Sequence, residues 1–120
     1  MTLGELIKKL SKYDKNKTIR IKSDVFIDIY LTDKIGSYRG YYDQLALGYG
    51  IDTYATVGQV LKACKAAVGE TFTGYKGGEY EMGVDTNVWI SNYGHASDIK
   101  IVNITEDGYG VWIEVFRDEY

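Results

Sequence analysis

Apolar residues recur at helical spacing in two stretches of the chain, 1–13 and 56–68. In the first stretch the apolar positions are Leu3, Leu6, Ile7 and Leu10. In the second stretch they are Val57, Val60, Leu61, Cys64 and Val68. Thr2 and Glu5 have the spacing of a capping box, and Gly69 stands where a helix commonly ends. We therefore predict an amphipathic helix over each stretch.

The two predicted helices begin with similar residues. Residues 2–8 are TLGELIK and residues 56–62 are TVGQVLK, so a residue of similar chemistry stands at every position of the two strings. Such a match is expected after an internal duplication. Seven residues are too few to establish one, and the sequence leaves that question open.

The rest of the chain alternates between β-rich runs and turns that contain glycine. The predicted strands are residues 18–22, 25–31, 44–49, 71–75, 79–82, 88–91, 98–105 and 109–116. The pairs Gly77-Gly78 and Asp107-Gly108 are typical of tight hairpin turns. Strands joined by short turns pair mainly antiparallel. The predicted fold class is α+β, with two amphipathic helices packed on mainly antiparallel β-sheets in a single domain, 1–120.

Composition narrows the class of protein and its chemistry. With 120 residues, of which 45% are hydrophobic, the chain can build a core without disulfides or metals. No apolar run approaches the roughly 20 residues that span a bilayer, and no leader opens the chain, so we expect a cytoplasmic protein without a membrane partner. Cys64 and His95 are single residues of their types, which excludes a disulfide framework and argues against a Cys/His metal site. We expect no cofactor.

Charge is distributed unevenly along the chain. The formal net charge is −3, and seven of the 14 basic residues fall between Lys8 and Lys22. From Ser23 onward there are fifteen acidic residues and seven basic ones. A long nucleic acid binds through many Lys and Arg contacts that release counterions. We therefore expect no DNA or RNA partner, whereas a small anionic ligand held by one or two cations fits this composition.

Tyrosine makes up 12 of the 17 aromatic residues and is densest in residues 37–44. This segment combines Arg39 with Tyr41 and Tyr42 around a glycine. Arginine offers a planar fork of donors to a phosphate, and tyrosine rings offer stacking faces to a base or a sugar. The three residues are therefore candidates for a nucleotide site. The alternative is that the rings are half-buried sheet residues and that Arg39 pairs with Asp43.

A second candidate segment surrounds the Gly77-Gly78 turn. It places Phe72, Tyr75 and Lys76 on or beside the predicted hairpin. It is not a P-loop, because the Gly-Lys-Ser/Thr ending and the following helix are both missing. The alternative is an ordinary exposed glycine hairpin.

A third candidate segment follows the predicted strand at residues 88–91. Asn92 can donate to and accept from a base edge or a ribose, and Tyr93 stands beside it. The alternative is that Trp89 belongs to the core, that Asn92 caps a turn and that His95 is a surface loop residue.

The sequence contains no recognised catalytic arrangement. No serine, histidine and aspartate accompany a nucleophile elbow, and no Glu–His spacing indicates a metal. Acid–base chemistry by Asp43 or Glu79 stays open, although neither lies in a context that predicts a raised pKa. We therefore predict a binding protein rather than an enzyme.

Four strings of the sequence together resemble the first family of phage-encoded Thoeris anti-defence proteins. They are SYRGYYDQLALGY at 37–49, TVGQVLKA at 56–63, FTGYKGGEY at 72–80 and WISNYG at 89–94. The tyrosine-rich string is distinctive, whereas the other three are individually weak. The resemblance covers most of the chain from about residue 37 to residue 94.

The resemblance implies a function and an assembly. Members of that family act as molecular sponges in the cytoplasm of the host bacterium. They bind cyclic ADP-ribose isomers made by TIR-domain enzymes and hold them uncleaved. They are homo-oligomers built from dimers, a hexamer among them, with the signal pocket at the dimer interface. The alternatives are a sponge for cyclic oligonucleotide signals, an enzyme that degrades the signal, and a protein-interaction inhibitor of a defence enzyme.

The resemblance also suggests roles for individual residues. Arg39 is the first predicted phosphate contact, and Lys76 or Arg20 is the second. The predicted stacking platforms for the adenine are Phe72 and Tyr75. Asn92 is predicted to bind a base edge or a ribose hydroxyl. The residues predicted to line the pocket are Tyr41, Tyr42 and Tyr93. Any basic contact from the C-terminal third of the chain must come from Lys100 or Arg117.

Overall fold

The computed structural model describes residues 1–22, 30–37, 44–50, 55–73, 79–90, 99–108 and 110–117. The helices within these residues are α1 (Leu3–Leu10) and α2 (Val57–Ala67). The strands are β1 (Ile19–Lys22), β2 (Tyr30–Ser37), β3 (Gln44–Gly50), β4 (Thr71–Thr73), β5 (Glu79–Glu81), β6 (Asn87–Ile90), β7 (Ile99–Asp107) and β8 (Gly110–Arg117).

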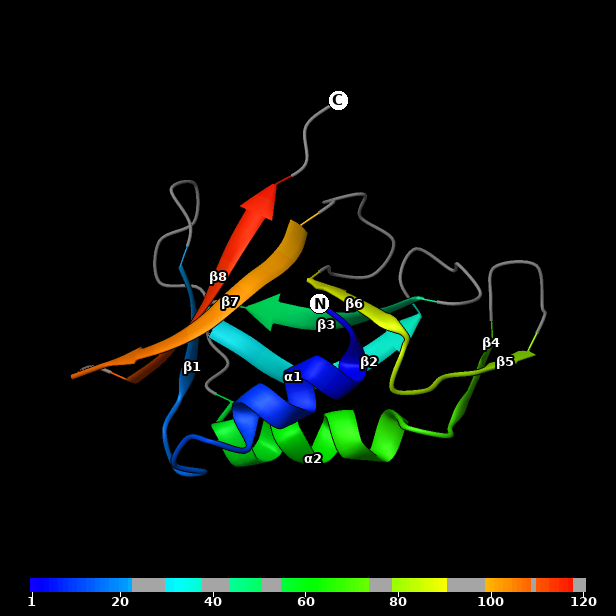
Figure 1. Cartoon of the computed structure of the whole chain (residues 1–120), viewed down its shortest axis with the longest axis horizontal. Helices are drawn as coiled ribbons and strands as arrows, with labels where there is room; N and C mark the ends of the chain where they lie inside the picture. Colours follow the sequence, from blue (N-terminus) through cyan, green and yellow to red (C-terminus); the bar gives the residue numbers. More distant parts are fainter. Residues whose placement is uncertain are drawn as a thin grey trace.

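Six of the described strands close into a barrel in the order β1-β2-β3-β6-β7-β8 (Figure 1). The triplets β1-β2-β3 and β6-β7-β8 are each antiparallel. Two parallel pairs, β1 with β8 and β3 with β6, join the triplets into a ring. Strands β4 and β5 form a separate antiparallel pair. The α+β class and the mainly antiparallel pairing are confirmed. The parallel pairs lie outside the prediction, because local turn signals do not say which distant strands meet.

Both helices begin at capping boxes. The Thr2 hydroxyl accepts a hydrogen bond from the Glu5 N–H, and the Thr56 hydroxyl accepts one from the Gln59 N–H, at 3.2 Å in each case. The Glu5 and Gln59 side chains in turn accept from the backbone N–H of the two threonines. Hydrogen bonds from Thr2 hold the pKa of the Glu5 carboxyl below its usual value.

Helix α1 is shorter than the predicted helix 1–13. Beyond Leu10 the chain tightens into turns, in which the Tyr13 N–H donates to the Leu10 carbonyl at 3.2 Å. This change of direction brings the Tyr13 hydroxyl to 3.0 Å from the carbonyl oxygen of Ile104 on β7. The tertiary contact therefore ends the helix earlier than the apolar spacing alone suggests.

Helix α2 ends at Ala67, one residue before the predicted end. Val68 was assigned to the apolar stripe, but it is the C-cap residue, has extended backbone and is 40% exposed. Gly69 follows with φ +81°, which fits its predicted role at the end of the helix.

The strand predictions agree with the structure for β1 and β3 to β8 within two residues at each described end. The exception is the strand predicted at 25–31. Strand β2 instead runs from Tyr30 to Ser37 and contains a bulge between Leu31 and Ile35. Residues 25–29 of the predicted strand lie outside the described residues.

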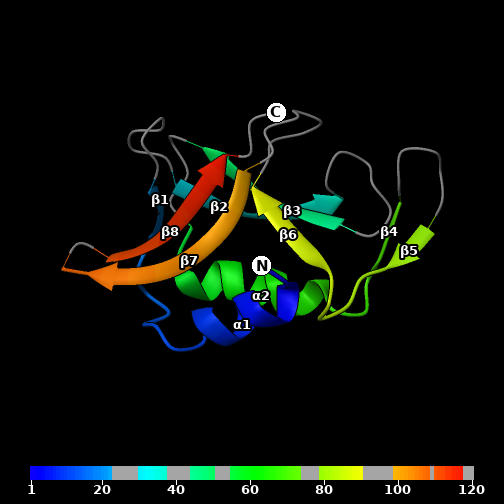
Figure 2. The ribbon, with the colours of Figure 1, turned by 45° about the horizontal axis from the view of Figure 1, so that its top comes forward.

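The two helices lie side by side along one side of the barrel (Figure 2). Leu3, Leu6 and Leu10 of α1 are fully buried, and they share one hydrophobic core with α2 and with the inward-facing residues of the strands. Along β1 the burial alternates, so Ile19 and Ile21 face this core. The side chains at the outward positions of the strands do not pack in this core and can contact solvent or a ligand.

Cys64 of α2 lies fully buried in this core, and burial raises the pKa of its thiol to about 12. Because the thiolate is the reactive form, we expect iodoacetamide at mildly alkaline pH to leave Cys64 unmodified in the folded protein. Addition of urea should allow complete alkylation, which intact-mass measurement detects. Rapid alkylation without denaturant would contradict the burial.

The barrel is made of two α-β-β-β units that are arranged alike. The first unit is α1-β1-β2-β3, and the second is α2-β6-β7-β8 with the β4–β5 pair inserted after its helix. Each helix starts against the segment that precedes the first strand of the other unit. The Leu3 N–H donates to the Thr86 carbonyl at 2.7 Å, and the Val57 N–H donates to the Lys17 carbonyl at 2.8 Å.

The glycine shared by the TLG and TVG strings has the same role in both units. A Cβ atom at Gly4 would stand 3.1 Å from the carbonyl oxygen of Val84, and one at Gly58 would stand 3.1 Å from that of Lys15. Either contact is tighter than a normal Cβ contact, so both helix starts need glycine to approach the neighbouring backbone. The repeated strand order and these matching contacts support the internal duplication that the sequence left open.

Candidate functional site

Most of the predicted ligand-binding residues lie outside the described residues. These are Arg39, Tyr41, Tyr42, Tyr75, Lys76, Asn92 and Tyr93. The structure does describe the strands on either side of them. The end of β2, the start of β3 and the β4–β5 pair lie on the same side of the barrel (Figure 1). Segments 38–43 and 74–78 are therefore attached at that side. The start of β6 pairs with the start of β3. Segment 91–98 is attached at the other end of β6, about 10 Å along the strand from that start.

Phe72, a predicted stacking platform, lies in β4 directly opposite Tyr80 of β5. Its side chain is half-buried and packs against the hydrophobic core. Part of the ring is therefore committed to the fold.

Arg20 lies on the outer face of β1, between Tyr30 of β2 and Trp112 of β8. Its guanidinium carbon is 5.2 Å from the centre of the Tyr30 ring and 5.5 Å from that of Trp112, which are cation–π distances. In the ring of six described strands, β1 and β6 are three strands apart in either direction. Within one chain, Arg20 and the residues of β6 therefore belong to different sites.

Trp89 is the centre of a site that the described residues do form. Strand β6 alternates in burial, so Val88 and Ile90 are buried in the core while Trp89 lies half-buried on the outer face. The indole N–H of Trp89 donates to the side-chain oxygen of Gln44 on β3. On the other side, Lys100 of β7 is the cross-strand partner of Trp89, and its ammonium nitrogen stands 5.7 Å from the centre of the indole ring.

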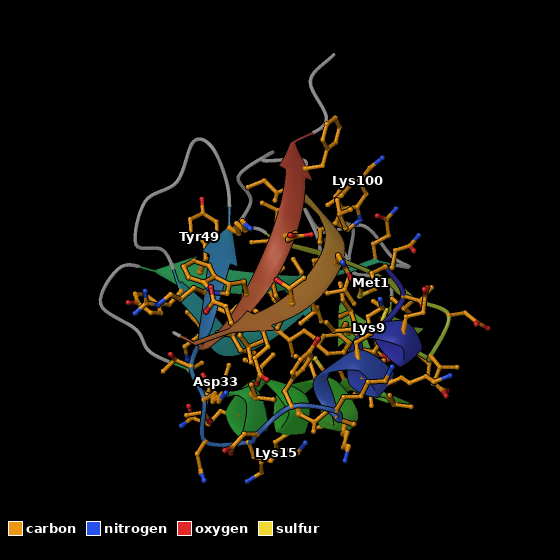
Figure 3. All side chains as sticks on the ribbon, turned by 60° about the vertical axis from the view of Figure 1, so that its left-hand side comes forward. Met1, Lys9, Lys15, Asp33, Tyr49 and Lys100 are labelled. Atoms are coloured by element: carbon orange, nitrogen blue, oxygen red, sulfur yellow. The ribbon has the colours of Figure 1, made fainter. Side chains whose placement is uncertain are left out.

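A pocket of about 310 Å³ opens at this tryptophan. It is lined by Met1, Asn87, Val88, Trp89 and Lys100. The Val88 N–H donates to the Met1 carbonyl at 2.9 Å, so the start of the chain is fixed as one wall. Figure 3 shows Lys100 and Met1 on the same side of the molecule.

A second pocket, of about 440 Å³, lies beside the first. Asn87 lines both, and the second pocket is completed by Gln44 and by the turn at 83–86, which includes Asp85. Small-molecule sites typically measure about 300–1,000 Å³, so each pocket is at the lower end of that range and the pair falls within it.

The groups in the two pockets are suited to an anionic nucleotide. An indole face can stack on a base, and the Lys100 ammonium can pair with a phosphate. The side-chain amides of Gln44 and Asn87 can donate and accept, and the Asp85 carboxylate can accept from ribose hydroxyls. In the part of the chain that the structure describes, no three His, Cys, Asp or Glu side chains are grouped as a metal site.

The sequence analysis did not assign Trp89 or Gln44 to the site, and it named Lys100 only as one of two residues that could supply a basic contact from the C-terminal third of the chain. Trp89 was weighed as a core residue, yet the pattern of β6 contains the signal that corrects this. Val88 and Ile90 are both aliphatic, so a strand places Trp89 between them on the opposite face. Gln44 and Lys100 become visible as its partners only once the pairing of β3, β6 and β7 is known.

Among the described residues, no helix is both long enough and apolar enough to cross a membrane. Comparison with models of known protein families, with curated protein sequences and with solved structures finds no match to this chain.

Proposed function

We propose that this chain is a phage anti-defence protein that captures a cyclic ADP-ribose-type immune signal in the cytoplasm of the host bacterium and holds it uncleaved. The observation that carries the proposal is the environment of Trp89, whose ring lies beside the Lys100 ammonium and whose N–H is held by Gln44. The resemblance to the first family of Thoeris anti-defence proteins suggests the ligand, a product of TIR-domain enzymes. The pocket supports the wider class, a compact anionic nucleotide.

Each group in the pocket has a role that requires no bond to break. The adenine stacks on the exposed part of the Trp89 ring, and the hydrogen bond from the indole to Gln44 fixes the orientation of that ring. Lys100, an exposed residue, pairs with one phosphate of the ligand. The Asp85 carboxylate accepts from the ribose hydroxyls, and the Asn87 amide donates to them or accepts from them. The result is capture rather than catalysis.

The energies indicate which further contacts the proposal needs. Stacking on Trp89 contributes about 1–3 kcal/mol, and an ion pair with the exposed Lys100 contributes about 0.2–1 kcal/mol. Nanomolar capture requires about −12 kcal/mol, although a rigid cyclic ligand loses little freedom on binding. We assign the missing contacts to Arg39 and Asn92, because their segments join the described strands at Gln44 and at Ile90.

Recovery of the ligand after capture tests the proposal. We expect the protein, incubated with a cyclic ADP-ribose isomer, to deplete the free ligand from an ultrafiltrate. Heat denaturation should then release the ligand unchanged, as judged by chromatography and mass spectrometry. Linear ADP-ribose or another cleavage product in the released fraction would instead identify an enzyme that degrades the signal. Absence of depletion would contradict capture altogether.

One observation favours a second candidate function, the direct inhibition of a protein. Phe116 of β8 and Val102 of β7 are 60% and 58% exposed, and Phe116 is the cross-strand partner of Lys100. Exposed aromatic and aliphatic side chains beside a pocket fit either a partner protein or a second copy of this chain in the proposed dimer-based homo-oligomer, such as a hexamer. Co-purification of a defence enzyme, with no ligand depletion in the same preparation, would favour the second candidate.

A cyclic oligonucleotide is the remaining alternative ligand, because it shares the base and phosphate groups that the pocket suits. Competition decides between the two ligand classes. We expect an excess of a cyclic dinucleotide or trinucleotide to leave the captured cyclic ADP-ribose isomer in place.

A further inference from the structure

The internal repeat relates two clusters on opposite sides of the barrel. Thr18 and Asn87 occupy equivalent positions, because each forms an isolated β-bridge with the threonine that caps the helix of the other unit. Two residues further along β1 and β6 stand Arg20 and Trp89, which are therefore equivalent as well. In the repeat, Arg20 therefore occupies the position that is equivalent to Trp89 of the pocket described above.

The cross-strand neighbours of these two residues also correspond. Arg20 pairs with Tyr30 in the first unit, as Trp89 pairs with Lys100 in the second. On the other side, Arg20 pairs with Trp112 of β8. Both units therefore combine a cation and an aromatic ring on the outer face at equivalent positions. At Arg20 the cation is central, flanked by the Tyr30 ring of its own unit and by the Trp112 ring of the other unit.

The Arg20 cluster contains two donors that lack an acceptor. Arg20 Nε and Trp112 Nε1 are both buried and have no hydrogen-bond partner among the residues that the structure describes. The described ion pairs of the neighbouring lysines are Lys17 with Glu106 and Lys22 with Glu114, and no described carboxylate pairs with Arg20. A buried donor without an acceptor destabilises a folded protein, and two such donors in one cluster are uncommon in native structures. A bound acceptor would remove this cost.

We propose that the Arg20 cluster is a second binding site, specific for an oxyanion of the phosphate or carboxylate type. A guanidinium held between aromatic faces keeps its in-plane N–H groups for a bidentate acceptor. The indole N–H of Trp112 adds a neutral donor next to it. Part of Arg20 and part of Trp112 remain exposed. Because the two donor nitrogens themselves are buried, we expect a local rearrangement of the neighbouring side chains to admit the acceptor. This site is independent of the Trp89 pocket and of the ligand proposed for it.

The two tryptophans of the chain make the second site directly measurable. A ¹⁵N–¹H spectrum of the full-length protein contains one indole signal for each, and Trp112→Phe identifies the one from Trp112. We expect inorganic phosphate to shift the Trp112 indole signal and the Arg20 Nε–H signal together, along one saturable curve. Sodium acetate in a parallel titration distinguishes phosphate from carboxylate preference. Sodium chloride at matched ionic strength gives the shift due to screening alone.

Variants distinguish specific binding of the anion at Arg20 from nonspecific attraction of anions to the positive charges of β1. Arg20→Gln should abolish the saturable shift of the Trp112 signal. Lys22→Gln removes a charge from the same strand and should leave that shift intact, since Lys22 is exposed and faces Glu114 at 3.9 Å. If Arg20→Gln fails to fold, Arg20→Lys keeps the charge, lacks the planar fork and should weaken the shift strongly. The proposal is overturned if phosphate and acetate move the two signals no further than chloride does. It is equally overturned if Arg20→Gln and Arg20→Lys both retain the wild-type curve.

Discussion

Replacement of Trp89 by alanine is expected to weaken capture of a cyclic ADP-ribose isomer by about 5- to 150-fold, the equivalent of the roughly 1–3 kcal/mol that stacking of a base on an aromatic ring contributes. Trp89 is half-buried on the outer face of β6, where its removal leaves the core residues Val88 and Ile90 in place. The loss should therefore appear in the dissociation constant from isothermal titration calorimetry, with little change in the unfolding midpoint.

Trp112→Phe is the matched control for this experiment. Trp112 lies on β8, pairs with β1 and is likewise half-buried on the outer face, but it belongs to the cluster on the far side of the barrel. The control should bind the ligand as the wild type does. Equal affinities of Trp89→Ala and the wild type would remove the pocket from the proposed function, whatever the ligand proves to be.

Leu6→Ala is expected to lower the free energy of unfolding by about 2–5 kcal/mol, because a fully buried leucine is replaced and the space is only partly refilled. Leu6 of α1 is 0% exposed and belongs to the core that α1 shares with α2 and the strands. A loss of this size is a large share of the 5–15 kcal/mol that typically stabilises a domain. Urea denaturation followed by circular dichroism measures it through the shift of the midpoint.

Lys8→Ala is the control on the same helix. Lys8 is exposed, and alanine is a good helix former, so the free energy of unfolding should change by no more than about 0.5 kcal/mol. Similar losses in the two variants would mean that α1 does not pack on the barrel through the face that contains Leu6.

Local structure was predictable from the sequence wherever one short segment specifies it. The Thr2–Glu5 capping box, the helical spacing of Leu3, Leu6 and Leu10, and the alternation at Ile19 and Ile21 each identify an element from neighbouring residues. These signals depend on contacts within a few residues of one another, so the rest of the fold does not alter them. The corrections at Tyr13 and Val68 occur where an element ends, because tertiary contacts decide the last turn.

Closure of the barrel was not predictable in the same way. The parallel pair of Ile19 with Val111 joins strands that are far apart in the sequence, and no local pattern specifies such a pair. For the same reason the candidate site was only partly identified. Arg20 was grouped with the other predicted ligand residues by its chemistry alone, whereas the ring of described strands places it opposite β6. Gln44 and Lys100 can likewise be identified as the partners of Trp89 only when the order of the strands is known.

The indole signals of the two tryptophans also test the central claim, that the ligand binds against Trp89. In a titration of full-length, ¹⁵N-labelled protein with a purified cyclic ADP-ribose isomer, we predict that the Trp89 indole signal shifts and saturates as the ligand binds, because the ring that stacks on the base also donates to Gln44. A ligand that binds while the Trp89 signal keeps its free position would contradict the account.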